Sequence, residues 1–479
     1  MKFINYSLFT VVFSFFIFSC SKKITPQQSE AYMPALTNKG DIQVWLSEED
    51  KSALFKQQKA TKFSKVKNQL PSIEVNKTRK FQQIDGFGFC LTDGSAYLIN
   101  RMAEEDKSKL LNELFSTEGN SIGISYLRIS IGASDLSSQV YSYDDLPAGQ
   151  TDSALSKFSI AENEKDLVPI LKMILKINPS IKILGSPWSA PVWMKDNNSS
   201  IGGSLRSKYY DVYANYFVKY IQAMKAEGIN IEAITPQNEP LNPKNNPSMY
   251  MSAEQERDFI KNSLGPALHK AGISTKILCY DHNADEPNYP LTILKDPEAR
   301  KYVDGSAFHL YAGDISALSK VHNAFPEKNI YFTEQYTGSG STFAADLSWA
   351  IQNLIIGATR NWSKNVLEWN LASDPNLEPH TDGGCNTCLG AVTIDGNHVT
   401  KNQSYYIIAH ASKFVRPGSY RIESSEVKGL ANVAFVNPAG KKILIVINTT
   451  STKQDFKLKF QNQLAVTSLN AGAVATYVW

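Results

Sequence analysis

Between residues 84 and 374 the chain alternates apolar, β-rich runs with segments of helical periodicity. The runs are rich in β-branched and aromatic residues and have the length of buried strands. Eight such runs cover residues 84–93, 125–135, 181–191, 231–240, 275–283, 305–314, 329–336 and 365–374. Segments between them repeat apolar residues at spacings of three and four, over residues 104–116, 164–179, 209–228 and 253–272. Eight strands alternating with helices predict an α/β fold, a (β/α)8 TIM barrel.

An open, doubly wound sheet is the alternative for this alternation. Such sheets commonly carry a glycine-rich phosphate-binding turn after the first strand. Here the first run contains "GFGFCLTDG", residues 86–94, which matches neither GxGxxG nor a P-loop. The barrel is therefore the favoured fold.

The hydrophobic pattern changes after the predicted barrel. Short strand-like pieces separated by turns, such as "KKILIVINTT" (441–450) and "AVATYVW" (473–479), predict an antiparallel β-sandwich. The segment before the first run has the same character. We therefore expect residues 41–83 and 385–479 to form an accessory side β-sandwich, and residues 84–384 to form the barrel.

The N-terminus has the pattern of an export signal. Lys2 precedes the apolar run "LFTVVFSFFIFSC", residues 8–20, which is short for a membrane span. Its end, "IFSC", resembles a bacterial lipobox, in which Cys20 becomes the lipidated first residue. We expect residues 1–20 to be a lipoprotein-type signal peptide, with a plain signal peptide as the alternative, and polar residues 21–40 to be a tether. The prediction is an exported lipoprotein of the bacterial cell envelope, with a lipid anchor as its sole membrane contact.

Composition and cysteine spacing limit the classes of partner and cofactor that the chain is expected to bind. The 49 basic and 46 acidic residues leave a net charge of +3, which gives no reason to expect nucleic acid. Cys90 and Cys279 lie in apolar runs and are expected to be buried. Cys385 and Cys388 form a CxxC pair without a second CxxC, so a local disulfide is favoured over zinc. We find no coherent metal ligand set and expect no cofactor.

The eight runs share a second feature, because each ends in polar or aromatic residues. Strand ends of a barrel converge on one face, and that face carries the active site. A few polar strand ends are common in any fold, but eight in register indicate a site. The residues at these ends are Asp93, Asp135, Trp188, Glu239, His282, His309, Tyr311, Glu334, Trp369 and Asn370.

Two of these ends are glutamates. "ITPQNEP" ends the fourth run on Glu239, and "NIYFTEQY" carries Glu334 in the seventh. A protonated and an ionised carboxyl on either side of a glycosidic bond are the machinery of glycosidases. A separation of about 5–5.5 Å suits retention of configuration and about 6.5–9.5 Å suits inversion. Asn238 precedes Glu239, and its amide is placed to bind a sugar 2-hydroxyl.

An ordered set of motifs makes the chain resemble glycoside hydrolase family 30. These are "QQIDGFGFCLTDGSA", "YLRISIGASDLS", "GSPWSAPVWMKDN", "TPQNEP", "FHLY", "FTEQ", "EWNLASDP" and "HASKFVRPGSYRI", spread over roughly residues 40–479. The family includes glucosylceramidases and microbial β-1,6-glucanases. The resemblance implies a barrel with a side β-sandwich and a retaining double displacement.

By motif, Glu239 matches the family's acid/base and Glu334 its nucleophile. Arg128 matches an arginine beside the nucleophile, which would help to keep Glu334 ionised. The remaining matched positions line the family's sugar subsite: Asp135, Trp188, Asn238, His309, Tyr311, Trp369 and Asn370. Asp93 and His282 are weaker candidates, and the alternative role for each is to hold a loop in place.

The departures from the family pattern bear on the substrate. Phe89 stands where the family has the second glycine of "GFGG". The loop "GGCNTCLGAVTID", residues 383–395, resembles β-1,6-glucanases and other microbial members more than animal lipid hydrolases. The expected substrate is β-1,6-glucan or another β-glucoside. The alternatives are a glucosylceramidase, an exo-acting β-glucosidase or β-xylosidase, and, from another class, a non-catalytic surface glycan-binding lipoprotein.

Overall fold

The computed structural model describes Met1 and residues 41–64 and 69–479, and the described residues from 41 onward belong to one compact unit. The predicted signal peptide and tether, including Cys20, lie outside the described residues apart from Met1. Within the described part of the chain, none of the helices combines the length and apolar character needed to cross a bilayer.

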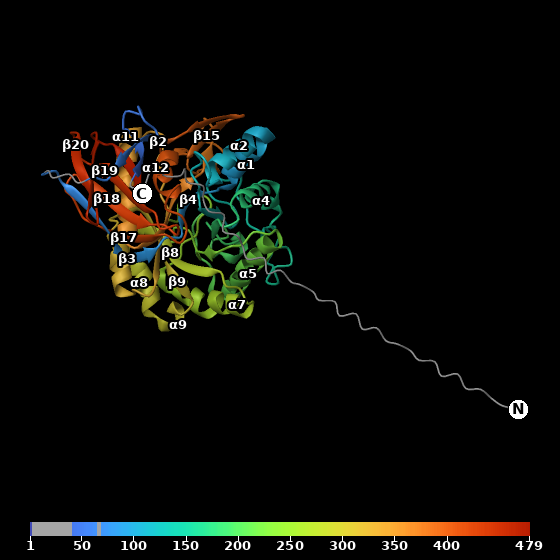
Figure 1. Ribbon diagram of the computed structural model, residues 1–479. Helices are drawn as coiled ribbons and strands as arrows, with labels where there is room; N and C mark the ends of the chain where they lie inside the picture. The colour runs from blue at the N-terminus through green and yellow to red at the C-terminus, as the bar shows by residue number, and fades with distance from the viewer. Residues whose placement is uncertain (2–40, 65–68) are drawn as a thin grey trace. The chain divides into compact units, whose positions relative to one another are not determined.

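The predicted barrel is confirmed. Eight parallel strands close in the order β10-β12-β4-β5-β6-β7-β8-β9, with β9 paired to β10, and each overlaps one of the eight apolar runs. Figure 1 labels β4, β8 and β9 among them. The strands are β4 (Gly86–Cys90), β5 (Tyr126–Ser130), β6 (Lys182–Ser186), β7 (Ala233–Ile234), β8 (Lys276–Ala284), β9 (Val303–Gly313), β10 (Asn329–Glu334) and β12 (Ser363–Asn370).

Helices follow the strands around the barrel, as the 3.6-residue periodicity predicts. Gly228 and Gly272 end two of the four predicted helical segments with φ of 80° and 65°, the left-handed conformation that glycine adopts at C′. The helices are α1 (Asp93–Arg101), α2 (Glu104–Phe115), α3 (Ala161–Lys165), α4 (Leu167–Ile177), α5 (Tyr210–Ala226), α6 (Ala253–Phe259), α7 (Gly265–Lys270), α8 (Asn288–Lys295), α9 (Pro297–Arg300), α10 (Ala317–Ala324) and α11 (Phe343–Ala350). Helical pieces of 3₁₀ geometry are η1 (Val192–Met194) and η2 (Ser207–Tyr209), and pieces of π geometry are η3 (Ile260–Leu264) and η4 (Ile351–Ala358).

The axis of the barrel is filled by one apolar layer. Seven of its strands each contribute one buried side chain to this cluster, and the eighth, β4, passes it with Gly88, where a Cβ would lie 1.9 Å from the Tyr126 carbonyl oxygen. The layer is Tyr126, Leu184, Ala233, Leu278, Ala307, Tyr331 and Leu367. The interior is therefore a packed core, and the space for chemistry lies above this layer, at the carboxyl ends of the strands.

A nine-stranded sheet forms the second part of the fold, in the order β2-β1-β22-β19-β18-β17-β3-β20-β21. A bridge between Ser64 and Leu464 brings its two edges together around a separate apolar cluster, so the sheet has two facing layers. Its strands are β1 (Asp41–Ser47), β2 (Lys56–Lys62), β3 (Ser72–Gln83), β17 (Tyr420–Ser424), β18 (Leu430–Val436), β19 (Lys442–Asn448), β20 (Gln454–Phe460), β21 (Gln463–Leu469) and β22 (Val474–Val478).

The segment between the two parts pairs with the barrel loops. β14 (Cys388–Leu389) pairs with β11 (Thr337–Gly338), which follows barrel strand β10. β15 (Val392–Asp395) pairs with β13 (Ala372–Ser373), which follows β12, and with β16 (His398–Lys401). Helix α12 (Gln403–Ser412) then packs against β4 and β22. The strands of the nine-stranded sheet therefore come from residues 41–83 and 420–478, and residues 388–412 extend the barrel side.

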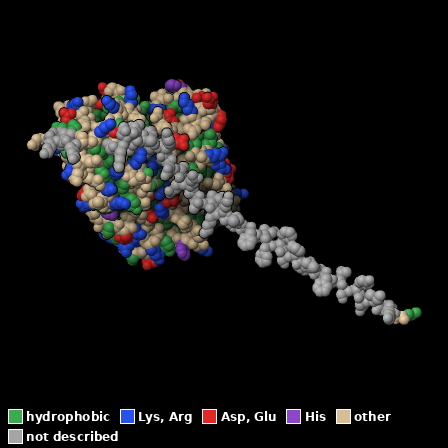
Figure 2. All heavy atoms as spheres, in the orientation of Figure 1, with side chains coloured by type: hydrophobic (Ala, Val, Ile, Leu, Met, Phe, Trp, Pro, Cys, Tyr) green, Lys and Arg blue, Asp and Glu red, His purple; other side chains and the backbone are tan. Residues whose placement is uncertain are grey.

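The surface in view carries both signs of charge. Figure 2 shows Lys and Arg side chains interspersed with Asp and Glu side chains over this face. This mixture accords with the near balance of charge in the sequence, a net +3.

Candidate active site

Directly above the apolar layer lies a layer of mostly polar side chains. Side chains two residues apart on a strand face the same side, so the residue two positions after each apolar member also points to the axis. Each member of this second layer is buried. It consists of Cys90, Arg128, Ser186, Thr235, Asp281, His309, Thr333 and Trp369.

One strand reaches this layer by an irregularity. From Leu278 the regular step of two would place Tyr280 inward, but the register of β8 shifts between Tyr280 and His282. Tyr280 and Asp281 take φ of 80° and 59°, the left-handed conformation typical of such bulges. The bulge places the Asp281 carboxylate among the inward side chains, where it meets Arg128.

Arg128 is the hub of the polar layer. Its guanidinium is fully buried and donates to Glu334 Oε2 at 2.5 Å, Asp281 Oδ2 at 2.8 Å and Asn238 Oδ1 at 2.6 Å. It also lies 4.8 Å from the ring centroid of Trp188. Burial would lower the pKa of Arg128, but the charges of Asp281 and Glu334 raise it, so the side chain stays cationic.

Asp281 is the partner that sequence reasoning missed. It accepts hydrogen bonds from the hydroxyls of Ser186, Thr235 and Thr333 at 2.6–2.8 Å, in addition to Arg128 and His309. Burial would raise its pKa, but Arg128 and His309 hold that pKa well below its ordinary value. In the sequence, Asp281 immediately precedes His282, the residue recognised at this strand end. The bulge in β8 that turns the Asp281 side chain inward has no recognisable pattern in the local sequence.

His309 joins the two predicted carboxylates. Its Nδ1 lies 3.3 Å from Glu239 Oε1 and 3.7 Å from Glu334 Oε1, and its Nε2 lies 3.1 Å from Asp281 Oδ1. Because both glutamates flank one ring nitrogen, their nearest oxygens are at most about 7 Å apart. A separation of at most about 7 Å is compatible with the roughly 5–5.5 Å between the carboxyls of retaining glycosidases. It excludes most of the roughly 6.5–9.5 Å range of inverting glycosidases.

The charges around His309 set the protonation of the site. Burial would lower the pKa of His309, but the charges of Glu334, Asp281 and Glu239 raise it to about 9. Burial would raise the pKa of Glu239, yet the hydrogen bond and charge of His309 lower it. Burial raises the pKa of Glu334, against the opposing charges of His309 and Arg128. At neutral pH the imidazolium of His309 thus donates toward Glu239 and Asp281.

The backbone at Glu239 is held in an uncommon conformation. Its φ is 45°, a left-handed value that few residues other than glycine adopt. The Glu239 N–H donates to the carbonyl of Asp281 at 3.0 Å, and the Asn238 N–H donates to that of Pro187 at 2.7 Å. Asn242 Nδ2 donates to Glu239 Oε2 at 2.8 Å. These bonds hold the turn that follows β7, and the turn directs Glu239 toward His309.

The predicted sugar-subsite residues gather around the same point. Trp188 and Trp369 are in contact, with ring centroids 5.2 Å apart. The Tyr311 hydroxyl donates to Glu334 Oε1 at 2.9 Å. Asp135 is buried, and burial followed by the charges of Glu334 and Glu239 raises its pKa to about 7. Asn370 is buried beside the loop of Cys388, to whose carbonyl it donates at 3.4 Å.

Two other strand-end residues have different surroundings. Asp93 begins helix α1, and its carboxylate accepts from Ser137 and Tyr141 at 2.7 Å, so it holds a loop. His282 lies next to the acid/base candidate, with Nδ1 3.9 Å from Glu239 Oε1 and no hydrogen-bond partner for that atom. Glu239, His282 and His309 bring three ligand-type atoms within 4.8 Å of one another, close enough to share a cation. This group was not predicted from the sequence, because its three residues lie on different strand ends without a recognised metal-ligand spacing.

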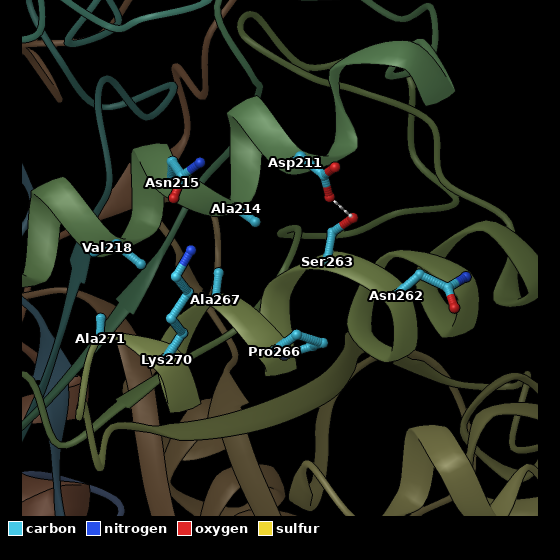
Figure 3. A pocket seen from close by; sticks show the side chains of 10 residues that line it. All are labelled: Asp211, Ala214, Asn215, Val218, Asn262, Ser263, Pro266, Ala267, Lys270 and Ala271. Atoms are coloured by element: carbon cyan, nitrogen blue, oxygen red, sulfur yellow. Dashed lines mark hydrogen bonds between the residues drawn. The ribbon is translucent and has the colours of Figure 1, made fainter.

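A surface groove of about 500 Å³ lies elsewhere, between α5 and the η3–α7 segment (Figure 3). Asp211 accepts a hydrogen bond from Ser263 across it at 2.6 Å. None of the predicted site residues lines it. The paired carboxylates and the contacting tryptophans therefore identify the barrel mouth as the candidate site.

Two buried carboxyls flank one imidazolium at the carboxyl ends of barrel strands, beside two tryptophans in contact, and this arrangement defines a glycoside hydrolase site. The glycosyl hydrolase family 30 TIM-barrel domain model matches residues 84–415, and the family 30 β-sandwich domain model matches residues 418–477. The chain belongs to glycoside hydrolase family 30 and is an O-glycoside hydrolase.

Individual relatives agree with this membership. The chain is 37% identical to the endo-1,6-β-D-glucanase of Neurospora crassa over 415 residues, 83% of each chain. It is 30% identical to the lysosomal acid glucosylceramidase of Mus musculus over 434 residues, 84% of this chain and 82% of the relative. Among solved structures, the endo-β1,6-glucanase BT3312 aligns with a TM-score of 0.86 at 36% identity, covering 92% of this chain and 99% of its own.

The Asp281→Asn substitution is expected to lower the pKa of His309 from about 9 by roughly 1–3 units. The negative charge of Asp281 stabilises the imidazolium, so its removal favours the neutral ring, which then loses its proton at lower pH. The pKa is measured from the NMR titration of the ring protons, assigned with a His309→Gln variant. Ser186→Ala is the matched control, because it removes one hydrogen bond from the carboxylate and keeps its charge. A His309 pKa unchanged in Asp281→Asn would contradict this role.

Proposed function

We propose that the chain is a retaining β-1,6-glucanase in which Glu334 is the nucleophile and Glu239 the acid/base. The observation that carries the assignment is the placement of Glu239 and Glu334 on either side of His309, with Arg128 bound to Glu334 alone of the two. The relatives named as endo-1,6-β-glucanases in two comparisons favour β-1,6-glucan as the substrate and internal cleavage as its mode.

Glu334 is the better nucleophile of the pair. Attack on the anomeric carbon requires an ionised oxygen, and Arg128 and the Tyr311 hydroxyl each hold one oxygen of this carboxylate. The guanidinium favours the charged form against the effect of burial. In the first step the Glu334 oxygen bonds to the anomeric carbon as the glycosidic C–O bond breaks.

Glu239 supplies the proton to the leaving oxygen, and His309 acts with it as a unit. His309 Nδ1 and Glu239 Oε1 lie 3.3 Å apart, so a proton can pass between them and the two groups titrate as a pair. Transfer from Nδ1 to Glu239 leaves a neutral imidazole and a protonated carboxyl facing the leaving group. In the second step water attacks the glycosyl-enzyme, and the Glu239–His309 pair takes the proton back.

The surrounding side chains suit a glucosyl unit. The Asn238 oxygen accepts from Arg128, which leaves its NH2 group to donate to the sugar 2-hydroxyl, a bond that strengthens in the transition state. Trp188 and Trp369 offer an aromatic wall, and Asp135 offers a carboxylate to the remaining hydroxyls.

Product analysis tests the substrate. We expect short β-1,6-linked oligosaccharides from β-1,6-glucan, and little release from β-1,3-glucan, an aryl β-glucoside or glucosylceramide, with products separated by chromatography. The Glu334→Gln variant is the control, and its turnover should fall on the order of 10⁴-fold or more. Glucose as the sole product, or hydrolysis confined to the aryl glucoside, would move the function to an exo-β-glucosidase. Hydrolysis confined to glucosylceramide would move it to a glucosylceramidase, as the 30% identity to the mouse enzyme allows.

Azide rescue tests the two roles separately. With an activated aryl glycoside of a β-1,6-linked gluco-oligosaccharide, Glu334→Ala plus azide should give the α-glycosyl azide, because azide attacks in place of the missing nucleophile. Glu239→Ala plus azide should give the β-glycosyl azide, because azide then attacks a glycosyl-enzyme formed on Glu334. The anomeric proton coupling in NMR distinguishes the products. The opposite pairing of variant and product would exchange the two assignments.

We further propose that the protein is exported and anchored through a lipid on Cys20. The support is the basic start at Lys2, the short apolar run of residues 8–20 and the "IFSC" ending. In bacterial cells expressing the full chain, we expect the protein in the membrane fraction and a Cys20→Ser variant in the soluble fraction, as followed by immunoblot. Equal partitioning of the two forms would refute the anchor.

A further inference from the structure

The loop of residues 381–389 contacts three parts of the site: Asp135, the segment that follows Glu334, and the pair of tryptophans. The structure pairs Cys385 with Cys388 as a disulfide, as the CxxC spacing favoured. Cys385 is half-buried, and the two residues between the cysteines are exposed, so the bridge lies within reach of solvent reagents.

On one side the loop holds Asp135. The Thr381 N–H donates to the Asp135 carbonyl at 2.9 Å, and the Cys385 N–H donates to the Asp135 carboxylate. Gly384 allows this approach, because a Cβ there would lie 2.3 Å from the Asp135 carbonyl oxygen. The Asp135 side chain is buried, so hydrogen bonds from the backbone N–H groups of the loop help to fix its position.

On the other side the loop holds the chain that follows Glu334. Strand β14, which contains Cys388, pairs with β11 at Thr337 and Gly338. The Ser339 N–H donates to the Thr387 carbonyl at 2.9 Å, inside the CxxC turn. The bridge therefore closes a turn whose backbone bonds the segments of Asp135 and Glu334 together.

The bridge also supports the aromatic wall. Cys388 belongs to a buried cluster with Cys90, Leu136, Trp188 and Trp369, and Cys385 packs against that cluster. Closing the turn thus fixes one face of the wall as well as the donor to Asp135.

We propose that the Cys385–Cys388 disulfide is a positioning element of the sugar pocket, so that oxidation of this pair completes the pocket and its reduction impairs hydrolysis. The inference rests on the proposed function, in which Asp135 and the tryptophans bind the glucosyl unit. Opening the bridge frees the Cys385 amide from the Asp135 carboxylate, and a hydrogen bond to a charged group of this kind corresponds to roughly 10- to 100-fold in binding or rate.

A double-mutant cycle tests the connection to Asp135. We expect Cys385→Ser/Cys388→Ser to lower kcat/KM on the oligosaccharide substrate about 10- to 100-fold, with the loss in KM at least as large as that in kcat. In an Asp135→Asn background the same pair of substitutions should have a much smaller effect. Dithiothreitol should reproduce the loss in the wild type and leave the double serine variant unaffected. Equal losses in both backgrounds, or no loss, would overturn the inference.

Hydrogen exchange tests the same inference without catalysis. Reduction should raise deuterium uptake in peptides covering residues 130–138 and 337–341, as well as in the loop itself, because the loop's hydrogen bonds protect those segments. Uptake that rises within residues 381–389 alone would refute the positioning role. If the wild type hydrolyses no β-glucoside, the proposed function fails, and the exchange data still decide whether the bridge orders the pocket. The double serine variant, treated with dithiothreitol, controls for effects of the reagent.

Discussion

The buried ion pair of Arg128 and Asp281 is the constraint on which the site depends. Both side chains have no exposure, so each charge has lost its water and must be compensated within the protein. Asp281 accepts from three hydroxyls and from His309, and Arg128 donates to Glu334 and Asn238. Removing either partner would leave an uncompensated buried charge. The positions of the nucleophile candidate, the imidazolium and the 2-hydroxyl donor thus follow from one requirement of charge neutralisation.

Much of the site could be read from the sequence, because strand alternation and strand ends are local properties. The eight runs located all eight barrel strands, and their ends included Glu239, His309 and Glu334. Asp281 was not predicted, because the bulge after Tyr280 changes which residue faces the barrel axis, and tertiary contacts determine where a bulge forms. Ser186, Thr235 and Thr333 escaped because small hydroxyl residues inside apolar runs look like ordinary strand residues.

The organisation of the sheet part shows a similar limit. Alternating residues around 390–401 indicated strands, and strands form there, but their partners are β13 and each other. A strand pattern describes one face of one segment and contains nothing about which neighbour supplies the hydrogen bonds. The loop that carries the Cys385–Cys388 bridge lies in the same region, so its contact with Asp135, 250 residues earlier in the chain, was equally invisible.

The apolar layer beneath the polar one has a consequence for how a polymer meets this enzyme. Tyr126, Leu184 and Tyr331, with their neighbours, close the barrel axis beneath the site, so the site is reached from the mouth of the barrel. A sugar enters and leaves through the same mouth, and no product escapes at the rear. Any sugar unit beyond the one held at the strand ends therefore meets the loops rather than the barrel.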